Sequence, residues 1–131
     1  MDWVDVETAE DAAPADPGVY FFAWERPDGD LLTIYIGRGF SEQGIRRRVL
    51  DHIRGRRGGS ACLNAVINAA PDRIWVWWDD TDDVDAEADA FDAFEEEWGE
   101  GMRPPCVRRR AHAIRNPGWP EDWLDNWPDE G

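Results

Sequence analysis

The chain contains no lysine, only two cysteines and two histidines, and no long apolar run. No segment approaches the roughly 20 apolar residues that span a bilayer, and no charged segment followed by an apolar run marks a secretory leader. We therefore expect a soluble, cytoplasmic protein with no membrane association. Cys62 and Cys106 have neither a paired spacing nor neighbouring histidines, so the sequence supports neither a zinc site nor a disulfide framework. We expect two semi-buried free thiols.

The length of 131 residues is typical of a single domain with one core. Residues 1–16 are acidic and alanine-rich, and we expect them to form a loosely held arm. The ordered domain is expected to begin at Pro17 and to run to residue 107. Residues 108–131 form an extension that is rich in arginine and tryptophan.

Charge is distributed unevenly along the chain. The net charge of −15 would repel nucleic acid as a bulk property. All 14 basic residues are arginines, however, and seven lie in residues 38–57 and five in residues 103–115. If the fold brings these two stretches onto one face, guanidinium groups are available for phosphate. The alternative is that the arginines pair with the many carboxylates. The candidate phosphate contacts are Arg38, Arg46, Arg47, Arg54, Arg56, Arg57 and Arg103.

Two apolar segments separated by a turn predict a β-hairpin. Residues 18–25 are apolar on both sides, which is typical of a strand covered on both faces. Pro27 and Gly29 then favour a turn, and residues 31–37 form the returning strand. The two strands carry Tyr20 and Tyr35, but whether these share a face depends on a register that the sequence leaves open. Residues 74–78 predict a third strand.

Apolar residues at helical spacing predict a helix over about 43–55. Arg48 and His52 lie four residues apart along one edge of its apolar stripe, where core meets solvent. Ser60 is placed to cap a second helix, whose stripe begins at Leu63.

A third helix follows an acidic loop at 79–85, and Glu95 interrupts its apolar face. A carboxylate among aromatic residues needs a cation or a hydrogen-bond donor as partner. The alternatives are that Glu95 reaches water at the edge of the stripe or pairs with an arginine. Glu87, two turns earlier on nearly the same face, is the rival ligand, and we rank it lower because glutamate is ordinary at a helix start.

The chain resembles the GIY-YIG endonuclease superfamily. Pro17-Gly18-Val19-Tyr20 and Tyr35-Ile36-Gly37 match the two defining motifs, and residues 45–52 resemble the arginine helix. Residues 95–105, which end in Arg103-Pro104-Pro105, resemble the acidic helix and its exit. The resemblance covers residues 17–107 and implies an α/β (α+β) domain with a three-stranded, mostly antiparallel sheet flanked by helices.

The chain departs from the family pattern at Val107, where members often carry an asparagine that helps to hold phosphate. The connection from Tyr35 to Arg48 is also a few residues longer than in the shortest members. Asn64, Asn68 and Asn116 are candidates to take the place of the missing amide.

The resemblance implies a metal-dependent endonuclease, and the chemistry of phosphodiester hydrolysis gives each residue a role. Glu95 would hold one Mg²⁺ or Mn²⁺ ion against the scissile phosphate, and Arg48 would neutralise a non-bridging oxygen. Tyr20 or Tyr35 would position or deprotonate the attacking water. His52 is the candidate proton relay because its ordinary pKa lies near neutrality. Each tyrosine, and His52, is alternatively a packing residue.

Duplex, nicked and branched DNA are all admissible substrates, RNA is not excluded, and a role in DNA repair or mobile-element metabolism fits a stand-alone domain. The alternatives are a catalytically weakened nucleic-acid-binding module and an acidic interaction domain that mimics DNA. Trp119, Trp123 and Trp127 recur every fourth residue and predict a short helix. We expect this helix to pack onto the domain, with a homodimer contact or a base-stacking surface as alternatives.

Overall fold

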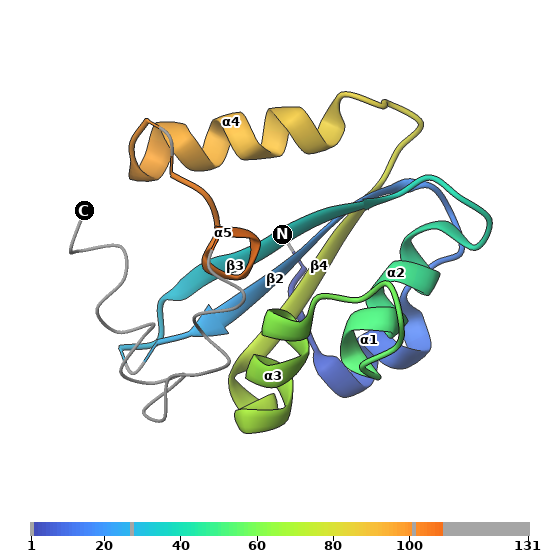
Figure 1. Cartoon of the computed structure of the whole chain (residues 1–131), viewed down its shortest axis with the longest axis horizontal. Coiled ribbons are helices and arrows are strands. Elements are labelled where there is room, and N and C mark those ends of the chain that lie inside the picture. The colour runs from blue at the N-terminus through green and yellow to red at the C-terminus, as the bar shows by residue number, and fades with distance from the viewer. Residues whose placement is uncertain (1, 27, 101, 109–131) are drawn as a thin grey trace.

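The computed structural model describes residues 2–26, 28–100 and 102–108. Its elements along the chain are β1 (Val4–Asp5), α1 (Val6–Ala12), β2 (Gly18–Glu25), β3 (Leu31–Gly39), α2 (Gly44–Ile53), α3 (Ala61–Ala69), the 3-10 turn η1 (Pro71–Arg73), β4 (Ile74–Asp80), α4 (Ala86–Trp98) and α5 (Pro105–Arg108) (Figure 1). The expected Trp-rich helix and the contacts proposed for it lie outside the described residues.

The strands form one antiparallel sheet in the order β1-β4-β2-β3. The expected hairpin is present as β2 and β3, with Phe22 opposite Tyr35 and Tyr20 opposite Gly37. The third expected strand is β4, which pairs with the other edge of β2. The predicted mixed α and β class is confirmed, with a fourth strand where three were expected, because the short β1 pairs with β4.

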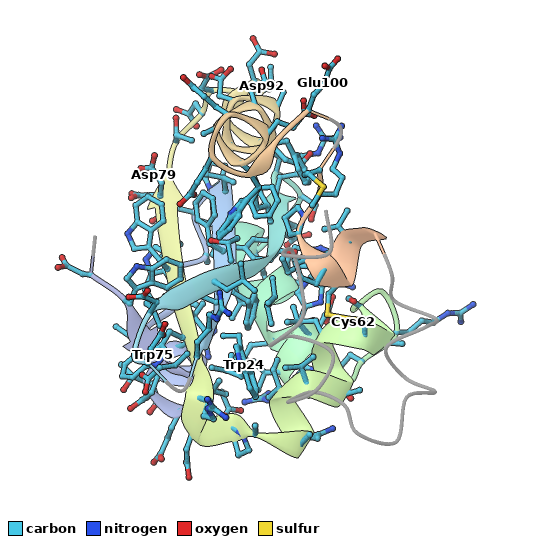
Figure 2. The ribbon with its side chains drawn as sticks, turned by 90° about the vertical axis from the view of Figure 1, so that its left-hand side faces the viewer. Trp24, Cys62, Trp75, Asp79, Asp92 and Glu100 are labelled. Atoms are coloured by element: carbon cyan, nitrogen blue, oxygen red, sulfur yellow. A yellow bond between two sulfur atoms is a disulfide. The ribbon has the colours of Figure 1, made fainter. Side chains whose placement is uncertain are left out.

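The sheet separates two layers of helices. In Figure 1, α1, α2 and α3 lie on one side of the sheet and α4 lies on the other. Adjacent strand residues point to opposite faces, so that Trp24 is buried on the face toward α3 while Trp75 lies on the other face (Figure 2). Asp92 and Glu100 point away from the sheet on the α4 side (Figure 2).

Local sequence signals account for several boundaries. The Oγ of Ser60 accepts a hydrogen bond from the Leu63 N–H at 3.1 Å, which confirms the predicted cap of α3. The buried residues of that helix include Leu63, Val66 and Ile67, as its stripe predicts.

Residues 2–16 do not form the loosely held arm that their composition predicts. Asp5 caps α1 by accepting a hydrogen bond from Thr8 N–H at 2.7 Å, and Ala9 is completely buried. The guanidinium of Arg46 donates to the Ala13 carbonyl at 3.2 Å, and the Arg46 N–H donates to the Pro14 carbonyl at 2.8 Å. The arm is therefore part of the domain, because small side chains let α1 approach α2 closely.

The expectation of free thiols is wrong. Cys62 of α3 and Cys106 of α5 form a disulfide, with their Cα atoms 5.3 Å apart. Both residues are buried, and the bond fastens α5 against α3 (Figure 2). Within the three described ranges, no helix is long and apolar enough to span a membrane.

Candidate functional site

Tyr20 and Tyr35 share the sheet face that is covered by α2. Their rings stack with centroids 6.2 Å apart, which resolves the register left open by the sequence. Tyr20 crosses over Gly37, where any Cβ atom would collide with the Tyr20 ring and hydroxyl. The glycine of the Tyr35-Ile36-Gly37 signature is therefore required by the tyrosine of the first signature. Tyr20 is completely buried, whereas Tyr35 is half-buried.

His52 connects this tyrosine pair to the loop before α3. Its Nδ1 accepts a hydrogen bond from the Ser60 N–H at 2.8 Å, so in the neutral ring Nε2 carries the proton. Nε2 lies 2.7 Å from the Tyr20 hydroxyl oxygen and donates to it. The loop backbone therefore sets the histidine tautomer, and the histidine in turn orients Tyr20.

The ionisation states follow from burial. Burial, with a smaller contribution from the Arg48 charge, lowers the pKa of His52 to about 3. Burial likewise raises the pKa of Tyr20 far above its usual range and raises the pKa of Tyr35, while Arg48 opposes both changes. At neutral pH, His52 is thus an uncharged donor, and both tyrosines carry their protons.

Among the described residues, Arg48 is the cation whose charge acts on these three rings. Its Nη1 donates to the Gly58 carbonyl at 2.8 Å and lies 3.7 Å from a carboxylate oxygen of Asp51. Its positive charge also lowers the pKa of both tyrosine hydroxyls, against the larger effect of burial. Arg48 therefore extends from the loop at Gly58 to the tyrosine pair.

A pocket of about 380 Å³ opens where these groups meet. It is lined by Tyr35, Ile36, Arg48, Gly58, Gly59, Ser60, Glu87, Phe91, Cys106 and Val107. Its walls come from β3, α2, the loop before α3, α4 and α5, so segments that are distant in the sequence converge on it. The disulfide holds α5 in place as one of these walls.

Among the described residues, the carboxylate that lines this pocket is Glu87, the residue ranked second from the sequence. Glu87 also contributes to the raised pKa of both tyrosines, which places its charge near their hydroxyls. Glu95 lies two helical turns further along α4, roughly 12 Å along its axis. It does not line the pocket and instead pairs with Arg103, the alternative that the sequence left open.

The structure separates the candidate phosphate contacts into distinct environments. Arg38 is well exposed at the pocket edge, with its Nε 3.7 Å from a Glu87 oxygen. Arg56 lines a neighbouring cavity that shares Gly59 and Ser60 with the pocket. Arg46 is bound to carbonyls at the end of α1, and Arg54 pairs with Glu10.

The three remaining candidate phosphate contacts also differ in their surroundings. Arg47 and Arg57 are exposed, and Arg103 lies over the Phe91 ring as well as against Glu95. Within the described residues, which include only 103–108 of the second stretch, the two arginine-rich stretches therefore meet at one place. They do so where Arg48 and Val107 line one pocket.

Sequence reasoning missed the loop of Gly58, Gly59 and Ser60 as part of the site. A Cβ atom at Gly59 would lie 2.5 Å from the Asp51 carbonyl oxygen, so the loop packs tightly on the end of α2. The Gly-Gly-Ser sequence carried a signal, since two glycines before a helix cap permit close backbone approach. Asn64 braces this region by donating to the His52 carbonyl at 2.9 Å, and it does not line the pocket.

The pocket combines a carboxylate, a guanidinium group and a tyrosine hydroxyl, a set suited to binding a phosphodiester and a water. In the described part of the chain, no group of three or more His, Cys, Asp or Glu residues forms a self-contained metal site. Comparisons with protein-family models, with curated proteins and with solved structures gave no match to this chain.

Proposed function

We propose that this chain is a metal-dependent endonuclease that hydrolyses DNA phosphodiester bonds at the pocket formed by Tyr35, Arg48 and Glu87. The observation that carries the proposal is the convergence of these three groups beside the buried Tyr20–His52 pair. Both tyrosines belong to the segments that resemble the GIY-YIG signatures. The absence of a membrane-spanning helix in the described residues is compatible with the cytoplasmic location expected for a DNA enzyme.

In the proposed reaction, a water oxygen bonds to phosphorus while the bond from phosphorus to the 3′ oxygen breaks. The products are a 5′-phosphate and a 3′-hydroxyl. One proton of the water goes to the 3′ oxygen, and the other goes with the new phosphate group. The barrier falls when developing negative charge on the phosphate oxygens is neutralised. Arg48 supplies a planar donor group for this purpose, and its Nη1 is already fixed by Gly58.

Tyr35 is the tyrosine that can touch substrate, because it lines the pocket and Tyr20 is completely buried. Its raised pKa means that it orients the attacking water as a neutral hydroxyl rather than as a phenolate. Tyr20 and His52 are positioning residues for Tyr35. The low pKa of His52 argues against the relay role expected from its sequence position.

The residues at the pocket fit a hard divalent cation that is shared with substrate. Mg²⁺ commonly keeps several waters and binds through one or two carboxylates plus substrate phosphate oxygens. Glu87, partly exposed at the pocket, would be its protein ligand, in place of Glu95. When bound, the cation would supply positive charge against the phosphate and the leaving oxygen.

A nucleic-acid-binding module without efficient cleavage is the second candidate. Val107 lines the pocket at the position where the resemblance calls for an asparagine, so α5 contributes an apolar side chain there. The acidic-mimic alternative rests on the net charge of −15 alone. An acidic mimic would not bind duplex DNA, whereas either of the other candidates would lose affinity as salt rises.

The test is nicking of supercoiled plasmid and of a branched DNA panel by the full chain. Wild type and Arg48→Ala are compared with Mg²⁺, with Mn²⁺ and with chelator. Nicking that needs the metal and falls by about 100-fold or more in Arg48→Ala supports the proposal. Salt-sensitive binding without nicking supports the binding module, and absence of both overturns each nucleic-acid function.

A further inference from the structure

We propose that Asp51 is a positioning residue for Arg48, whose guanidinium it holds in the orientation required for phosphate. The inference rests on the proposed function, which it extends by one residue that the sequence did not single out. Asp51 lies on α2, three residues after Arg48, and is only 6% exposed. No other carboxylate in the described part of the chain is as deeply buried.

The Asp51 carboxylate forms ion pairs with two arginines, Arg48 and Arg56. Oδ2 of Asp51 lies 3.7 Å from Nη1 of Arg48, and Oδ1 lies 4.0 Å from Nη1 of Arg56. The Asp51 backbone carbonyl also accepts the Arg56 N–H at 2.9 Å. Burying a carboxylate is costly unless it is paired, and these two cations pair it.

Asp51 and Gly58 engage the same nitrogen of Arg48. Nη1 donates to the Gly58 carbonyl at 2.8 Å and also lies near the Asp51 carboxylate, so two groups fix the position of this nitrogen. The Arg48 side chain meanwhile lines the pocket, and its charge lowers the pKa of both tyrosine hydroxyls. The carboxylate therefore fixes one end of a planar donor group that lines the pocket.

A carboxylate this close to a phosphate pocket opposes binding of the polyanion. The Asp51 carboxylate should therefore raise the cleavage rate while weakening DNA binding. A residue that only supports the fold would change the rate and the affinity in the same direction. Asp51→Asn keeps the volume and removes the charge. We expect DNA affinity to stay the same or to rise about twofold. We expect the cleavage rate at saturating enzyme to fall about 10- to 100-fold, because the guanidinium loses its alignment.

The experiment compares wild type, Asp51→Asn and Glu10→Gln in DNA binding and in single-turnover cleavage, with thermal unfolding as a check on folding. Glu10→Gln is the matched control, because it also removes one carboxylate from an arginine of the α2 region, Arg54, at 3.2 Å. Glu10 does not line the pocket. Side-chain ¹⁵N relaxation of Arg48 in the free protein provides a readout that does not depend on activity.

Slow cleavage with undiminished affinity in Asp51→Asn, together with greater mobility of the Arg48 Nε–H group and a normal rate in Glu10→Gln, supports the inference. Equal cleavage by wild type and Asp51→Asn overturns it while leaving the endonuclease in place. A parallel loss of affinity and rate, or unchanged Arg48 mobility, also overturns it. If wild type cuts no DNA, the proposed function fails, and the catalytic part of the inference fails with it.

Discussion

The hydroxyl of Tyr20 lies 2.7 Å from Nε2 of His52, and both residues are completely buried. The histidine can donate to this oxygen only in the tautomer that the Ser60 N–H selects at Nδ1, 2.8 Å away. A strand, a helix and a loop thus define one uncharged chain of hydrogen bonds behind the pocket.

This buried histidine makes stability depend on pH. Burial lowers the pKa of His52 from 6.5 to about 3, so between these values the unfolded chain holds a proton that the folded chain lacks. The free energy of unfolding should fall as the pH drops below 6.5, by up to about 1.4 kcal/mol per unit from this group. Above pH 6.5, His52 is neutral in both the folded and the unfolded chain, so it no longer lowers the free energy of unfolding.

Denaturant unfolding at pH 7, 6 and 5 measures how the free energy of unfolding changes with pH in wild type and in His52→Phe. His112→Phe, which changes the other histidine of the chain, is the control. The slope should be shallower in His52→Phe alone. Identical slopes in wild type and His52→Phe would mean that His52 does not carry the effect.

Gly37 should tolerate no side chain, because a Cβ atom there meets the Tyr20 ring. Gly37→Ala is expected to lower the free energy of unfolding by about 1–3 kcal/mol through overpacking. It should also abolish most cleavage by displacing Tyr20 from His52. Gly29→Ala, in the turn between β2 and β3, strains the backbone at its φ of 91° but meets nothing within 4 Å, so it should leave cleavage unchanged. Full activity in Gly37→Ala would contradict the packing of the two signatures.

The disulfide between Cys62 and Cys106 should stabilise the domain and its pocket wall. Reduction by a small dithiol is expected to lower the free energy of unfolding by about 2–4 kcal/mol and to slow cleavage. Cys106→Ser should resemble the reduced protein and should not respond to the dithiol. Two titratable thiols in the folded, air-oxidised protein would contradict the bond. In the proposed cytoplasmic location, cellular reductants would act on this bond.

Val107 faces the pocket with an apolar side chain where an amide would meet phosphate. Val107→Asn should increase cleavage or DNA affinity by about tenfold, the effect of one added hydrogen bond to a charged group. Val84→Asn, at an exposed position before α4, should change neither. No gain in Val107→Asn would show that this position does not contact substrate.

Local patterns were sufficient for the central hairpin, β4, the α3 cap and the pair Arg48 and His52, because these depend on alternation, spacing and capping within a few residues. The packing of α1 was not predictable, since Ala9 is buried only because α2 and β4 lie beside it. Cys62 and Cys106 are 44 residues apart, and their pairing depends on where α5 docks.

The choice between Glu87 and Glu95 depends on the placement of α4 over the sheet. Both residues lie on nearly the same face of that helix, so periodicity cannot separate them. The structure brings Glu87 to Arg38 at the end of β3 and Glu95 to Arg103. Only the first of these contacts adjoins Tyr35 and Arg48.

The most direct measurement is single-turnover DNA cleavage with Mg²⁺ by Glu87→Gln and Glu95→Gln, two matched substitutions on one helix. We expect Glu87→Gln to lose about 100-fold or more of the rate. Glu95→Gln should lose far less, because Glu95 is outside the pocket. A severe loss in Glu95→Gln together with a near-normal rate in Glu87→Gln would contradict the assignment of the active site to the Tyr35–Arg48–Glu87 pocket.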